Sequence, residues 1–278
     1  MTPGPDPDAE AAPQPTNFRA YVKLAGQAAR KSPEWADMDL GSGGPVVIES
    51  FGLVVGAGKD GILYVLNQHN MGKTQPGDLD HPAGNYAKLK SPPVFFTYFP
   101  PDLDPAPDDI ATLNTLFAER THHLHGNPLF WDSPDLGPVL YCWGENENLR
   151  AWSVGNDGKV TFLASSAEQA SAQSPVPPGG MPGGMLTLSA DGQAPHTGVV
   201  WATIPYLDAN TTISPGRLIA YDATQFGTFG NGARQIRKIW DSQDWNLTFT
   251  FNKFNVPVVA NGRLIVPTYE GRIDVYGP

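Results

Sequence analysis

The chain has 278 residues, with 28 acidic against 18 basic side chains and a formal net charge of −10. An acidic chain without a basic stripe repels phosphate backbones, so nucleic acid is not an expected partner. The composition holds 40% hydrophobic residues, enough for a core, and 30 Gly with 28 Pro, which predict many turns. No stretch approaches the roughly 18 to 20 consecutive apolar residues of a membrane span, so no transmembrane segment is expected.

The chain begins with a Pro-, Ala- and acid-rich stretch over residues 1–17, which predicts a flexible tail ahead of one domain over 18–278. Beyond the tail, short apolar runs end at Gly, Pro, Asn or Asp, which is typical of an all-β protein. Residues 68–121 and 157–180 are Pro-rich and polar, and we expect them to form long loops on one rim. In the first of these, Asp108 is placed to cap a short helix over 106–117.

A unit of three short apolar strands recurs four times along the chain. Its last strand is the clearest, because residues of matching size occupy matching positions. The four copies of that strand are residues 61–67, 147–153, 216–222 and 271–277. Alternate positions, such as Leu63 with Val65 and Ile273 with Val275, should share one face of each strand. Each unit therefore predicts an antiparallel meander of three or four strands.

Meanders of this kind cannot bury both of their faces alone. Stacking them radially covers the faces and leaves only short edges, which predicts an all-β β-propeller with about four recognisable blades, complete or as part of a larger ring. A β-sandwich without a true repeat is the alternative. The Trp residues and the single Cys142 lie in strand patterns and are expected in the core.

A histidine cluster, His122, His123 and His125, is the main candidate site. On an extended segment His123 and His125 share a face, with His122 opposite, and this spacing suits a divalent metal when further ligands complete the set. The alternative is that these imidazoles only hydrogen-bond loop backbone and pack between blades. Other residues just before the first strand of a unit should lie at the same channel mouth. They are Asp37 and Asp39 as further candidate metal ligands, Met181, and Lys253 and Asn255 as candidate ligand contacts.

Acidic residues follow the second predicted strand of the second unit. Glu145 and Glu147 alternate with Arg150 along one strand edge. This pattern favours a cross-strand ion pair over a pair of catalytic carboxylates.

Several segments resemble bacterial proteins with a pyrroloquinoline-quinone-like (quinoprotein-like) β-propeller. They include GAGKDGILY at 56–64, THHLHGNP at 121–128, GENENLRAW at 144–152 and VVANGRLIV at 258–266. The resemblance extends from about residue 36 to the C-terminus. It implies a propeller, either the C-terminal part of a ring or an abbreviated form. Because the family usually carries a secretion signal, it also implies a periplasmic or secreted location.

The predicted function is that of a binding or scaffold module whose His-bearing channel mouth binds a divalent metal or a small polar ligand. Its small-molecule or protein partner is not identified by the sequence. The alternative is a quinone- or metal-dependent oxidoreductase acting on small alcohols or sugars. Quinone-dependent alcohol dehydrogenases of the family carry a disulfide of adjacent cysteines over the quinone. Cys142 stands alone and cannot form one, so pyrroloquinoline quinone is not the expected cofactor.

Overall fold

The structure is a computed structural model that describes residues 42–59, 62–69, 94–95, 123–173 and 180–277. Over these ranges the chain forms β-strands and short 3-10 helices, η3 (Glu49–Phe51) and η5 (Ser242–Trp245), without any α-helix, which confirms the all-β prediction. No helix in the described part has the length and apolar character to cross a membrane. The predicted tail at 1–17 and the predicted helix at 106–117 lie outside the described residues.

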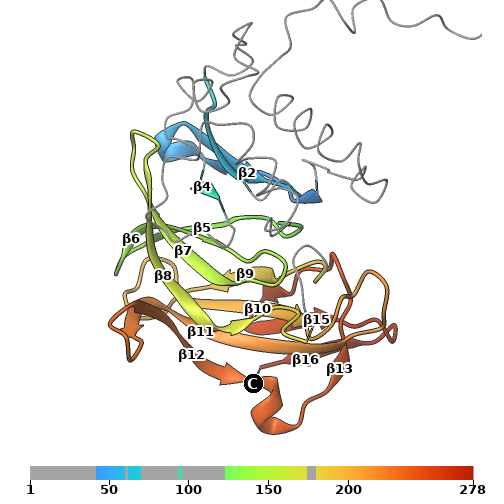
Figure 1. Cartoon of the computed structure of the whole chain (residues 1–278). Coiled ribbons are helices and arrows are strands. Elements are labelled where there is room, and N and C mark those ends of the chain that lie inside the picture. Colours follow the sequence, from blue (N-terminus) through green and yellow to red (C-terminus); the bar gives the residue numbers. More distant parts are fainter. Residues whose placement is uncertain (1–41, 60–61, 70–93, 96–122, 174–179, 278) are drawn as a thin grey trace, which may run out of the picture.

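Four antiparallel meanders follow one another along the chain (Figure 1). The first comprises β1 (Val46–Ile48), β2 (Leu53–Ala57), β3 (Ile62–Asn67) and β4 (Val94–Phe95). The second comprises β5 (Leu129–Ser133), β6 (Gly137–Cys142), β7 (Asn148–Val154) and β8 (Val160–Gln169). The third comprises β9 (Met185–Ser189), β10 (Val199–Pro205), β11 (Pro215–Thr228) and β12 (Arg234–Asp241), and the short β13 (Phe249–Thr250) pairs with β11. The fourth comprises β14 (Val258–Ala260), β15 (Arg263–Pro267) and β16 (Ile273–Tyr276).

The second and third meanders join into one large sheet. A parallel bridge between Ser165 and Gln235 connects β8 to β12, so that the strand order runs β5-β6-β7-β8-β12-β11-β10-β9. The end strands β5 and β9 contact each other, and the sheet nearly closes on itself like a barrel. The backbone segments that lead into β5 and β9 approach each other closely near this closure. A Cβ atom on Gly126 would lie 2.6 Å from the carbonyl oxygen of Gly184. Only glycine fits there.

The strand prediction holds for all four repeated last strands, which overlap β3, β7, β11 and β16. The loop prediction for residues 157–180 is wrong over Val160–Gln169, because β8 occupies this stretch and pairs with β7. Val160 and Ala164 are buried and Thr161 is exposed, which is the alternation of a strand. The prolines at 175, 177 and 178 dominated the composition of the range and hid this pattern.

Hydrophobic clusters lie between successive meanders. In the second meander, Leu149 and Ala151 on one face pack toward the third meander, and Trp152 on the other face packs toward the first. Cys142 is fully buried, as predicted. The fourth meander differs, because Ile273 and Val275 share a face as predicted but are 65% and 53% exposed. No described strand covers that face, whereas each middle meander is covered on both.

Candidate metal centre

The histidine segment that leads into β5 is held on both sides by hydrogen bonds to its backbone. The Leu124 amide donates to the Gly58 carbonyl at 3.1 Å, and the Ser42 hydroxyl donates to the Leu124 carbonyl at 2.7 Å. On the other side, the Glu145 amide donates to the His123 carbonyl at 2.8 Å. The segment is therefore fixed between the first meander and the turn that joins β6 to β7.

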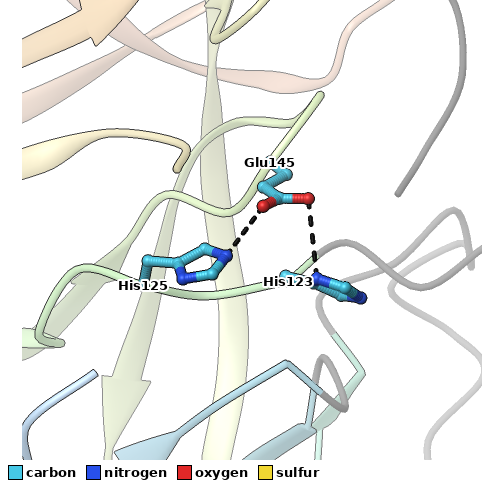
Figure 2. A group of neighbouring side chains, drawn as sticks. All are labelled: His123, His125 and Glu145. Carbon is cyan, nitrogen blue, oxygen red and sulfur yellow. Dashed lines mark hydrogen bonds and ion pairs between the residues drawn. The ribbon is translucent and has the colours of Figure 1, made fainter. Parts of the chain in front are cut away.

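This turn brings a carboxylate to the two imidazoles. Figure 2 shows Glu145 reaching His125 through one carboxylate oxygen and His123 through the other. His125 donates from Nε2 to Glu145 Oε1 at 2.7 Å, and His123 Nδ1 lies 3.7 Å from Oε2. One ligand atom from each of the three residues lies within 4.8 Å of the other two.

Burial is uneven across this cluster, which we call the His–Glu triad (His123, His125 and Glu145). The side chains of His125 and Glu145 are 1% and 3% exposed, and that of His123 is 13% exposed. A buried carboxylate is costly unless hydrogen-bonded or paired, and here the imidazoles meet that need. His123 is the most exposed of the three side chains.

The donor set of the triad matches a divalent transition metal. Imidazole nitrogen and carboxylate oxygen bind Zn²⁺ at about 2.0 to 2.2 Å, which places tetrahedral ligands about 3.4 Å apart. The imidazole nitrogens lie at comparable separations from the carboxylate, 2.7 Å from His125 Nε2 to Oε1 and 3.7 Å from His123 Nδ1 to Oε2. Ca²⁺ and Mg²⁺ prefer sets made of oxygen alone, so two imidazoles select against them. Two histidines and one carboxylate also leave coordination positions open.

Glu145 is the residue that sequence reasoning missed. The pattern grouped it with Glu147 and Arg150, but Arg150 forms an ion pair with Glu147, and the Glu145 carboxylate contacts the imidazoles. Burial raises the pKa of Glu147 to about 7, although Arg150 opposes the shift. Between the two acids, Asn146 adopts a left-handed φ of 51° that sends their side chains different ways.

The other predicted site residues either lie outside the described residues or form hydrogen bonds with residues other than the triad. His122, Asp37 and Asp39 lie outside the described residues. The Met181 carbonyl accepts from the Ala209 amide at 2.9 Å. Asn255 uses its side-chain amide within its own turn, donating to the Lys253 carbonyl at 3.2 Å.

The segment that leads into β14 meets the triad through Phe254. The centroid of the Phe254 ring lies 5.8 Å from that of His125. The Lys253 ammonium lies 5.6 Å from the Phe254 ring centre and donates to the Asn210 side-chain oxygen at 3.3 Å. The second and fourth meanders therefore meet at the triad, and sequence reasoning named Lys253 but not the phenylalanine beside it.

Fold and site together define an all-β protein with a candidate two-histidine, one-carboxylate metal centre. Comparisons of the chain with protein-family models, with curated proteins and with solved structures find no match. Function is therefore inferred from the chemistry of the site itself.

Proposed function

We propose that this protein is a quinoprotein-like β-propeller module that binds a divalent transition metal through His123, His125 and Glu145. The observation that carries the proposal is the convergence of two imidazoles and one carboxylate with their ligand atoms within 4.8 Å of one another. Zn²⁺, Fe²⁺, Co²⁺, Ni²⁺ and Cu²⁺ suit this donor set, and geometry and availability decide among them. An open coordination position lets the bound metal hold a small polar ligand at the channel mouth.

Contacts between the meanders support the propeller part of the proposal. The first strands of successive meanders are neighbours, since β1 contacts β5, β5 contacts β9, and β9 contacts β14. Radial blades place their innermost strands in this way around a central channel. The contact between His125 and Phe254 joins the segments that enter β5 and β14. Both segments would lie at one mouth of such a channel.

Metal titration of the full chain tests the proposal. After dialysis against EDTA, calorimetric titration with Zn²⁺ should give one site, and Co²⁺ should report imidazole coordination through its visible absorption. His125→Ala and Glu145→Gln should each weaken Zn²⁺ binding by about 100-fold or more, since even loss of an outer partner of a metal ligand costs about 10- to 100-fold.

His196→Ala is the matched control. The His196 side chain is 82% exposed and pairs with Asp135 at 3.0 Å. The substitution therefore also removes an imidazole beside a carboxylate. It should leave Zn²⁺ affinity unchanged. Unchanged affinity in His125→Ala and Glu145→Gln as well would overturn the metal centre and assign the triad to structural hydrogen bonding.

A further inference from the structure

We propose that the exchangeable ligand of this metal centre is a small organic carboxylate with an apolar body. Its carboxylate would bind the metal, its body would lie against Phe254, and the nearby Lys253 would attract the anion through its charge. This inference rests on the proposed metal centre and names the class of ligand that the centre accepts.

The charge at the site favours an anion. A divalent ion bound by the Glu145 carboxylate and two neutral imidazoles keeps a net positive charge. Lys253 adds a second positive charge beside Phe254, and within the described part of the chain it forms no ion pair. Its hydrogen-bond partner is the neutral amide of Asn210. A carboxylate bound to the metal is also attracted by the charge of Lys253, most strongly where water is excluded.

The position of Phe254 favours an organic body on that anion. Its ring lies near both His125 and Lys253, with its centre 5.8 Å from that of the His125 ring and 5.6 Å from the Lys253 ammonium. The residue is 49% exposed, so much of its apolar surface has no cover in the described structure. A ligand bound to the metal would cover that surface.

The backbone at Phe254 points to a role in binding. Its φ is 65°, in the left-handed region that bulky residues rarely adopt. Phe254 lies in a turn in which the Asn255 amide donates to the Asn252 carbonyl at 3.4 Å. Glycine at position 254 would adopt this φ without strain. Burial does not compensate for this strain, because the ring is half exposed. Strained residues of this kind persist at ligand sites.

Calorimetry on the Zn²⁺-loaded full chain tests the assignment with benzoate, acetate and phosphate as probes. Benzoate should bind more tightly than acetate, because only benzoate has a body to cover Phe254. Lys253→Gln should weaken both carboxylates by about threefold to tenfold, because it removes one positive charge near the bound anion. Phe254→Gly should reduce benzoate affinity to that of acetate and raise the melting temperature, since glycine adopts the left-handed φ without strain.

Lys159→Gln is the matched control, because Lys159 is an exposed lysine in the turn before β8. It should change no affinity, and Zn²⁺ affinity should be the same in all of these variants. If both Lys253→Gln and Phe254→Gly keep Zn²⁺ binding and leave the carboxylate affinities unchanged, the ligand assignment is wrong and the metal centre still stands. Phosphate binding as tightly as benzoate would overturn the apolar body. Absence of Zn²⁺ binding in the unsubstituted protein would instead overturn the metal centre.

Discussion

Two buried carboxylates in this molecule each contact two basic side chains, and they differ in what those side chains can do. Asp241 is fully buried and accepts from Arg217, from Lys238 at 2.8 Å and from the Gln243 amide at 3.1 Å. Glu145 is equally buried, but its partners are imidazoles. Guanidinium and ammonium groups have no lone pair for a metal, whereas a neutral imidazole has one. Similar burial therefore gives a structural anchor in one place and a ligand set in the other.

The setting of Asp241 confirms its structural role. It ends β12, and its side chain caps the 3-10 helix η5 that follows. Lys238 also lies 3.5 Å from Glu168 of β8, which accepts from the Tyr221 hydroxyl of β11 at 3.0 Å. Asp241 and Glu168 thus tie together the three strands that meet where the second and third meanders join.

The largest expected effect is on stability, and it separates the two carboxylates. Asp241→Asn leaves Arg217 and Lys238 beside a neutral amide and should lower the free energy of unfolding by about 3 kcal/mol, as breaking a buried ion pair does. Glu145→Gln, in EDTA, should cost only about 1 kcal/mol, because its imidazole partners are uncharged when deprotonated. Urea unfolding at pH 7.5 or above measures both.

Metal binding provides the reverse test of the same pair. Asp241→Asn should keep the Zn²⁺ affinity of the unsubstituted protein under conditions where it is folded, and Glu145→Gln should lose it. Equal losses of stability in the two variants would mean that Glu145 also acts as a structural anchor, and the contrast between the clusters would fail.

A second expected effect is the dependence of stability on acid. Burial alone would raise the pKa of Asp241, but hydrogen bonds from Arg217 and Lys238 outweigh it and hold the pKa below its usual range. The contribution of Asp241 to stability is therefore complete above its unfolded pKa of about 3.9 and is lost as the pH falls through the lower folded value.

Unfolding free energies measured between pH 6 and pH 2 in EDTA test this prediction. The difference in stability between the unsubstituted protein and Asp241→Asn should be constant above about pH 5 and should shrink below about pH 4. A difference that stays constant down to pH 2 would contradict the lowered pKa of Asp241.

The strands of this fold can be predicted from local sequence patterns. The packing of one sheet on another and the direction of side chains at turns cannot. Alternation alone places Leu149 and Ala151 on one buried face of β7. Ile273 and Val275 follow the same pattern but are exposed, because cover depends on a neighbouring sheet that the local sequence does not encode. The partner of Glu145 was missed for a similar reason, since the turn at Asn146 decides which acid meets Arg150.

The smallest expected effect concerns Asn255, which the sequence places at the channel mouth beside Lys253. Asn255 is exposed, and its side-chain amide donates a hydrogen bond to the Lys253 carbonyl of the same turn. Asn255→Ala should therefore change the free energy of unfolding by less than about 0.5 kcal/mol and leave Zn²⁺ affinity unchanged, as surface substitutions usually do. The titrations and urea curves used for the two carboxylates measure both quantities. A clear loss of Zn²⁺ affinity would show that the ligand set extends beyond the His–Glu triad onto the segment that leads into β14, whereas unchanged affinity would exclude Asn255 from that set.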